Sequence, residues 1–191
     1  KIDKEFGLNE IKTDGIDAII AADSGMDFLY ENGVTPDIIV GDFDSTTTNA
    51  LEYFERKGQT EIHRLNPIKD DTDTEYAIRL AIREGARSIV MLGATGSRID
   101  HVLGNISLLG IGLESGTDIN IIDTNNRIRM ADKPVTIEKS AQYGRFVSLI
   151  ALTDDNEVSL KGFKYPVTDY SFDRFTSLGI SNEIVDDHAL I

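Results

Sequence analysis

Aspartates that follow apolar runs are the residues of this chain best suited to chemistry. Asp42 and Asp44 stand two positions apart after one such run, and Asp70 and Asp73 follow the next. Two carboxylates in one tight loop repel each other, and a hard divalent cation relieves that repulsion. Mg2+ usually takes one or two carboxylates together with substrate phosphates. We therefore predict a magnesium site at these loops. The competing interpretation is that each Asp only caps the helix that follows.

A glycine-rich turn with the sequence GATGSR (residues 93–98) has the features of a phosphate-binding loop. Its glycines let backbone N–H groups approach phosphate oxygens, and a following helix N-terminus adds positive potential. Arg98 can bind a phosphate with two parallel hydrogen bonds. The turn matches neither a P-loop nor a dinucleotide fingerprint, so alone it is a weak signal. Asp100 and His101 open the helix, where a first-turn acid is favoured even without a ligand.

The elements that must position these residues alternate along the first part of the chain. Apolar runs at residues 18–22, 38–40, 62–64, 88–92 and 119–122 predict strands, with helical stretches between them. Thr72 and Glu75 have capping-box spacing, so a helix is expected to begin there. Strand-then-helix order predicts a parallel sheet, which binds ligands at the carboxyl ends of its strands. We therefore expect the candidate acids, Asp23 included, along one edge of one sheet.

After Asn126 the pattern changes to short alternating runs separated by turn clusters. Such runs predict antiparallel strands rather than further helices. The predicted fold class is α/β. An N-terminal parallel-sheet α/β catalytic domain (residues 1–126) is followed by a smaller C-terminal antiparallel β-sandwich domain (residues 127–191).

The chain has 191 residues and is acidic, with a net charge of -14 from 33 Asp and Glu against 19 Lys and Arg. Nucleic acid and anionic membranes need clustered Lys and Arg, so neither is an expected partner. No apolar run approaches the roughly 20 residues of a membrane span. The absence of Cys excludes disulfides and fits a reducing compartment such as the cytoplasm. A single nucleotide remains possible because Mg2+ supplies positive charge, and the parts together suit phosphoryl transfer.

The motifs resemble those of the thiamine pyrophosphokinase (thiamine diphosphokinase) family. They are AADSG (residues 21–25), GDFDS (41–45), KDDTD (69–73), GATGSRIDH (93–101) and SLGISNE (177–183), in that order. The resemblance implies transfer of the diphosphoryl group of ATP to the hydroxyl of thiamine, giving AMP and thiamine diphosphate. It also implies a homodimer with active sites at the subunit interface. Family members usually begin with a strand and a glycine-containing turn, and usually run one or two strands past this C-terminus. If these strands are absent from the protein, the resemblance implies that the sheet loses a central strand and part of the nucleotide site.

The resemblance assigns roles residue by residue. Asp42, Asp44 and Asp73 match the Mg2+-binding acids, and Ser181 and Asn182 match the segment that contacts the thiamine pyrimidine. Lys69 is either a phosphate contact or the ion-pair partner of Asp70. The proton acceptor is Asp100 or Asp73. The expected site comprises the metal ligands Asp42, Asp44 and Asp73; the nucleotide-binding residues Asp23, Lys69, Asp70, Gly93, Gly96 and Arg98; the substrate-binding residues Asp23, Asp100, Ser181 and Asn182; and the catalytic residues Asp73, Arg98 and Asp100.

Two alternatives remain open from the sequence. DFDST (residues 42–46) after a strand also fits the nucleophile loop of a haloacid-dehalogenase-like phosphatase. That interpretation lacks a second downstream acidic loop and leaves the β half unexplained. The other alternative is a non-catalytic module that binds thiamine or a nucleotide. The intact set of acids argues against it, because a sensor does not need so many potential metal ligands.

Overall fold

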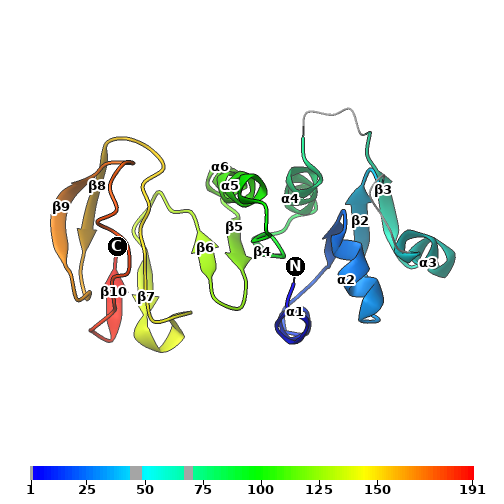
Figure 1. The fold of residues 1–191 in the computed structure, drawn as a ribbon, viewed down its shortest axis with the longest axis horizontal. Coiled ribbons are helices and arrows are strands. Elements are labelled where there is room, and N and C mark those ends of the chain that lie inside the picture. Colours follow the sequence, from blue (N-terminus) through cyan, green and yellow to red (C-terminus); the bar gives the residue numbers. More distant parts are fainter. Residues whose placement is uncertain (1, 44–48, 67–70) are drawn as a thin grey trace. The chain divides into compact units, whose positions relative to one another are not determined.

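A computed structural model describes residues 2–43, 49–66 and 71–191, which form two compact units, Lys1–Met130 and Ala131–Ile191 (Figure 1). Three of the expected site residues, Asp44, Lys69 and Asp70, lie outside the described residues. The elements of the first unit are α1 (Lys4–Ile11), β1 (Ile20–Ala22), α2 (Gly25–Glu31), β2 (Ile38–Gly41), α3 (Ala50–Lys57), β3 (Glu61–Arg64), α4 (Asp73–Arg83), β4 (Ser88–Leu92), α5 (Ile99–Leu108), α6 (Gly110–Ser115), β5 (Asp118–Ile122) and β6 (Arg127–Arg129). Those of the second unit are β7 (Thr136–Glu138), the 3-10 helix η1 (Lys139–Ala141), β8 (Asn156–Leu160), β9 (Val167–Phe172) and β10 (His188–Leu190).

The first three strands form a parallel sheet in the order β1-β2-β3. Its core contains Met26 of α2, Ile39 of β2 and Phe54 of α3, all fully buried. The apolar residues of α3 fall on one side of the helix, as expected for a helix that covers a sheet. This half of the unit confirms the predicted strand–helix alternation. Helix α3 begins at Ala50.

The next three strands form a second sheet, in the order β4-β5-β6. Strands β4 and β5 run parallel, while β6 returns antiparallel to β5. Our expectation of one sheet is therefore wrong for the described residues. There, β1, β2 and β3 form one sheet and β4, β5 and β6 form another, with no pairing between the two sheets. Strand β6, which the sequence pattern places in the second domain, belongs to the first unit because it pairs with β5 through a tight turn.

Local signals in the sequence define two of the helix starts. Helix α4 begins where predicted, and the Thr72 hydroxyl accepts a hydrogen bond from the Glu75 backbone N–H at 3.2 Å. Helix α1 has no counterpart among the predicted elements. The Asp3 carboxylate caps it by accepting from the Phe6 backbone N–H at 3.0 Å. A capped N-terminus satisfies a backbone donor that would otherwise have no partner in the helix.

The second unit contains two antiparallel pairs, β8 with β9 and β7 with β10. Its core is a small cluster of Leu160, Phe163, Ile184 and Ala189. Isolated bridges join Val147 to Asn182, and Phe163 to Ile184, and so tie the long loops to one another. These sheets fit the predicted antiparallel β class. In the part of the chain that the structure describes, no helix is long and apolar enough to span a membrane.

Candidate functional site

The first two candidate acids lie at the same edge of the β1-β2-β3 sheet. Asp23 directly follows β1 and Asp42 directly follows β2, and these strands are parallel neighbours. The Asp23 backbone N–H donates to the carbonyl of Val40 at 2.9 Å, which extends the pairing to the end of β1. Both acids are half-buried. The carboxyl ends of these strands therefore bring Asp23 and Asp42 to one edge, as predicted.

The turns after β1 and β2 each contain a residue with an unusual backbone. Phe43 has a φ of 62° and Asp23 a φ of 47°, which are left-handed values that only a few per cent of non-glycine residues adopt. Phe43 is 8% exposed and packs in the core of this sheet. The Arg64 guanidinium lies 5.5 Å from the centre of its ring. The buried ring anchors the turn and so holds Asp42 at the sheet edge. Strained backbone of this kind is concentrated at functional sites.

Asp73 is the first residue of α4 and is half-buried. Helix α4 contacts β1 and β2, the two strands that Asp23 and Asp42 follow. No group of three or more His, Asp or Glu side chains suited to a metal is found within residues 2–43, 49–66 and 71–191. Mg2+ needs only one or two carboxylates when substrate phosphates complete its ligands. The half-buried carboxylates of Asp42 and Asp73 are the donor type that fits this ion.

The two glycines of the 93–98 loop differ in their surroundings. Gly93 has a φ of 76°, and a Cβ added there would lie 2.9 Å from Cγ1 of Ile2. Glycine is therefore required at this position by the turn and by the close approach of the N-terminal segment. A Cβ at Gly96 would meet nothing within 4 Å. Of the two predicted nucleotide contacts, Gly96 has open space beside it, whereas Gly93 has a structural reason to be glycine.

Arg98 and Asp100 form an exposed ion pair at the start of α5. The guanidinium donates from Nη2 to Oδ2 of Asp100 at 2.6 Å and from Nε to Oδ1 at 3.3 Å. Their side chains are 69% and 65% exposed, so both remain accessible to a ligand. The hydrogen bond from Arg98 lowers the pKa of Asp100. A lowered pKa makes Asp100 a weaker proton acceptor at neutral pH while it is paired with Arg98.

One acid at a strand end is missing from the predicted site. Asp123 directly follows β5, and its Oδ2 accepts a hydrogen bond from the Thr95 hydroxyl of the 93–98 loop at 2.7 Å. From the other side, the Asn105 side-chain amide donates to the carbonyl of Ala94 at 2.9 Å. The rule that selects acids at the carboxyl ends of strands would have found Asp123. Its partner in the loop is visible only in the structure.

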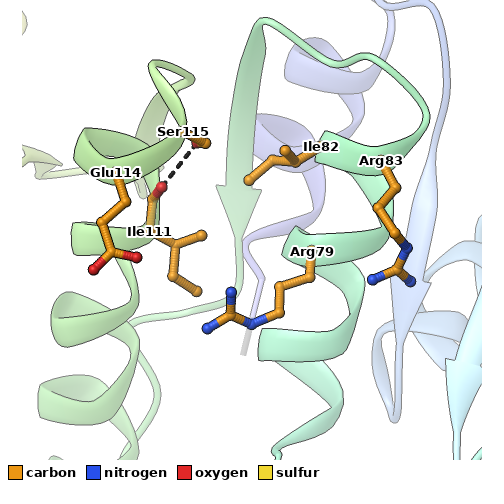
Figure 2. A pocket seen from close by; sticks show the side chains of 6 residues that line it. All are labelled: Arg79, Ile82, Arg83, Ile111, Glu114 and Ser115. Carbon is orange, nitrogen blue, oxygen red and sulfur yellow. Dashed lines mark hydrogen bonds between the residues drawn. The ribbon is translucent and has the colours of Figure 1, made fainter.

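A pocket lies between α4 and α6, lined by Arg79, Ile82, Arg83, Ile111, Glu114 and Ser115 (Figure 2). The α4 residues that line it come from the C-terminal half of the helix, whereas Asp73 is at its N-terminus. Arg79 is already paired with Glu75 at 2.8 Å. None of the expected site residues lines this pocket, so it is separate from the candidate site.

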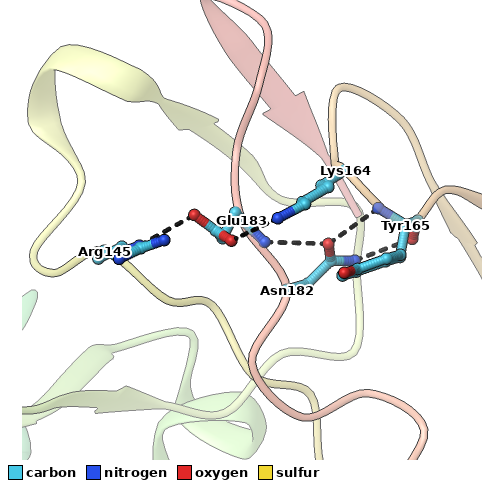
Figure 3. A network of polar contacts seen from close by, with 5 residues as sticks. All are labelled: Arg145, Lys164, Tyr165, Asn182 and Glu183. Carbon is cyan, nitrogen blue, oxygen red and sulfur yellow. Dashed lines mark hydrogen bonds and ion pairs between the residues drawn. The ribbon is translucent and has the colours of Figure 1, made fainter.

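In the second unit, the two expected thiamine-contact residues are placed differently, and Figure 3 shows the contacts of one of them, Asn182. Asn182 is 5% exposed, and its side chain is used inside the protein. Its Oδ1 accepts from the backbone N–H groups of Tyr165 at 3.1 Å and Glu183 at 2.9 Å, and its Nδ2 donates to the Tyr165 carbonyl at 2.9 Å. Ser181 is exposed and has a φ of 62°. Asn182 therefore clamps two loops together, and Ser181 lies at the surface beside the clamp.

Glu183 extends this network to two cations. Its carboxylate pairs with Arg145 and with Lys164, each at 3.0 Å. Hydrogen bonds from Arg145 and then Lys164 lower the pKa of Glu183. Arg145 also lies over the ring of Phe146, and Lys164 over that of Tyr165, with both rings exposed. The segment that contains Ser181 and Asn182 is thus held by buried amide bonds and by a surface ion network.

Family models match both parts of the chain. "Thiamin pyrophosphokinase, catalytic domain" matches residues 12–121, and "Thiamin pyrophosphokinase, vitamin B1 binding domain" matches residues 134–191. These two matches account for the β half, which the phosphatase alternative leaves unexplained.

Individual relatives agree with these matches. The thiamine pyrophosphokinase of Bacillus subtilis (strain 168) is 36% identical over 168 residues, covering 87% of this chain and 78% of the relative. The crystal structure of thiamine pyrophosphokinase from Bacillus subtilis superposes with a TM-score of 0.86 at 32% identity, covering 99% of this chain and 86% of that one. That of thiamin pyrophosphokinase from Geobacillus thermodenitrificans has a TM-score of 0.81 at 30% identity, covering 99% and 85%. The chain belongs to the thiamine pyrophosphokinase family.

Proposed function

We propose that this chain transfers the diphosphoryl group of ATP to the hydroxyl of thiamine, and that its acidic sheet edge is the site of that reaction. The carrying observation is that Asp23 and Asp42 lie at the carboxyl edge of one sheet, and that Asp73 begins a helix packed against the same two strands, inside the region that matches the family's catalytic domain. Phosphoryl transfer depends chiefly on positioning and charge neutralisation, which such a site provides. The products are AMP and thiamine diphosphate.

Asp42 and Asp73 are the residues that would hold Mg2+, together with Asp44 from outside the described part of the chain. Bound there, the ion supplies charge neutralisation for the ATP phosphates. The chain has a net charge of -14, which repels an anionic nucleotide, and the positive charge of Mg2+ offsets this repulsion. The buried Phe43 ring keeps the Asp42 turn in place before any ligand arrives. Asp23, on the neighbouring strand, completes the acidic edge.

The 93–98 loop supplies the groups that bind phosphate. Arg98 is exposed and carries a planar fork of donors, so it can exchange part of its pairing with Asp100 for phosphate oxygens. Gly96 leaves open space for backbone N–H groups to approach the nucleotide. Negative charge develops on the departing AMP during transfer, and Arg98 neutralises it. Asp73 and Asp100 are the two candidate acceptors of the thiamine hydroxyl proton.

The second unit provides the thiamine site. Residues 134–191 match the family's vitamin B1 binding domain, and Ser181 and Asn182 lie within this range. We assign the direct contact to the exposed Ser181. Asn182 acts by fixing the segment, because its amide is already bonded to Tyr165 and Glu183. The positive charge of thiamine suits an acidic protein.

The active form is proposed to be a homodimer with its sites at the subunit interface. The second unit exposes large apolar side chains, among them Phe175 at 89% and Ile150 at 71%. Contiguous patches of such side chains mark contact regions, whereas single exposed ones are ordinary, so the dimer is proposed chiefly from the resemblance to the family. Sedimentation should give twice the chain mass, and Ile150→Glu should shift the protein towards monomer. A cytoplasmic location is part of the same proposal, in keeping with a reaction that consumes ATP.

The test is AMP formation from ATP, measured with and without thiamine and with and without Mg2+. The proposal expects AMP only when both are present. ATP hydrolysis that ignores thiamine, with release of inorganic phosphate, would instead indicate a phosphatase. Tight thiamine binding with no turnover under any condition would indicate a non-catalytic module.

A further inference from the structure

Side-chain hydrogen bonds from outside the loop hold the first half of the 93–98 loop. Thr95 bonds to Asp123 through its hydroxyl, and the carbonyl of Ala94 accepts from Asn105. Ala94 is buried, and Thr95 is half-buried. From Gly96 onward the loop is exposed up to the start of α5. Thr95 thus lies at the boundary between the buried part of the loop and the part that faces solvent.

Asp123 is itself held rigidly. Its Oδ1 accepts from the backbone N–H groups of Asn125 and Asn126, both at 2.8 Å. The Asn126 side-chain amide reaches both carboxylate oxygens, at 3.1 and 3.2 Å. These bonds form the turn that joins β5 to β6, so the carboxylate is oriented by a sheet hairpin and not by the loop that it supports.

The charge on Asp123 strengthens its bond to Thr95. Partial burial acts to raise the pKa of Asp123, but hydrogen bonds from Thr95, Asn125 and Asn126 outweigh burial, and the pKa is lowered. The carboxylate is therefore ionised at neutral pH. A hydrogen bond to an ionised acceptor is stronger than one between neutral groups.

We propose that Asp123, acting through Thr95, is a positioning residue that sets the nucleotide-binding conformation of the 93–98 loop. The inference rests on the proposed function, since it assumes that this loop contacts the nucleotide. Neither residue need touch a substrate. The hydrogen bond between Thr95 and Asp123 connects the β5-β6 turn to the loop that ends in Arg98. A small displacement of Arg98 is enough to weaken its hydrogen bonds to a phosphate.

The experiment compares Thr95→Val, Thr95→Ser and Asp123→Asn with the wild-type protein. Valine keeps the shape of threonine and removes the hydroxyl, whereas serine keeps the hydroxyl. The matched control is Asp118→Asn, an exposed acid at the opposite end of β5. AMP binding is measured by calorimetry, which needs no turnover, and KM for ATP and KM for thiamine are measured separately.

Thr95→Val and Asp123→Asn should each weaken AMP binding and raise KM for ATP by about 10-fold, with KM for thiamine little changed. Thr95→Ser and Asp118→Asn should behave like wild type. A purely structural role would lower the melting temperature without this split between the two substrates. Unchanged AMP binding in Thr95→Val and Asp123→Asn overturns the inference, as does a Thr95→Ser variant as impaired as Thr95→Val. If wild-type protein binds AMP but forms none from ATP and thiamine, the proposed function fails while the AMP-binding comparison still decides this inference.

Discussion

The two units present their motif residues in opposite ways. In the first unit, Arg98 and Asp100 are exposed, and the loop before them is anchored by Asp123 and Asn105, which belong to no recognised motif. In the second unit the motif residue Asn182 is itself the anchor, with its amide bonded to neighbouring backbone. The comparison teaches that an exposed motif residue, even one in a surface ion pair, is a better candidate for ligand contact than a buried one whose bonds hold the fold together.

The largest effect is expected at the acidic edge of the first unit. Asp42→Asn should lower thiamine-dependent AMP formation by about 1,000-fold, because loss of a metal ligand removes several kcal/mol of charge stabilisation. The melting temperature should change little. The matched control is Asp37→Ala, at the opposite end of β2, where the carboxylate accepts from the Ile19 backbone N–H at 2.8 Å. Asp37→Ala should lose stability and keep activity, and the reverse pattern would refute the assignment of Asp42.

A smaller loss of activity is expected at Arg98. Arg98→Lys keeps the charge but loses the planar fork, and kcat should fall by about 100-fold. Steady-state kinetics would measure the change, with Arg83→Lys as the control. Arg83 is at the far end of α4, where it lies over the ring of Tyr76. A fully active Arg98→Lys variant would show that Arg98 does not need to bind the phosphate through two hydrogen bonds.

In the second unit, substitution of the buried motif residue should reduce stability more than it reduces catalysis. Asn182→Ala removes three hydrogen bonds from a buried site, and the free energy of unfolding should fall by about 2 kcal/mol in urea titrations. Ser181→Gly suits the positive φ at that position and should leave stability unchanged or slightly raised, while KM for thiamine increases. An Asn182→Ala variant with normal stability but a raised KM for thiamine would reverse the roles given to these neighbours.

The smallest effect concerns the pH dependence of stability at Glu183. Its pKa is lowered in the folded protein by Arg145 and Lys164. The stability that the ionised Glu183 gives to the folded protein is therefore fully present above the unfolded-state pKa of about 4.3. It is lost as the pH falls through the lower pKa of the folded state. Glu183→Gln should flatten the acid side of a melting-temperature profile below about pH 4.3. Salt should reduce the difference between variant and wild type, since the network is on the surface. A variant profile that runs parallel to wild type would show that the network contributes nothing.

Features that depend on local sequence could be predicted. Thr72 and Glu75 sit at capping-box spacing, and the helix begins between them. Asp23 and Asp42 end apolar runs, and strand pairing brings them to one edge. The helix start and the ends of the strands depend on residues only a few positions apart, where steric and hydrogen-bonding preferences act directly. The parallel pairing of the two strands follows from their strand–helix order.

Features that depend on contacts between residues far apart in the sequence could not be predicted. Thr95 and Asp123 are separated by a helix pair and a strand, so nothing in either local sequence reveals their bond. Strand β6 has the same alternating pattern whether it pairs with β5 or with a strand of the second unit, and the turn at Asp123 decides between them. Asn182 has a motif position that indicates ligand contact, but the burial that engages its amide arises from packing in the second unit.

The central claim is that this chain transfers a diphosphoryl group, and it is tested most directly by following a label. ATP labelled at the β-phosphorus should deliver its label to thiamine diphosphate, with unlabelled AMP as the second product. Label recovered in ADP would indicate transfer of a single phosphoryl group, and label recovered only in ATP or free phosphate would indicate no transfer to thiamine. Either result would contradict the account.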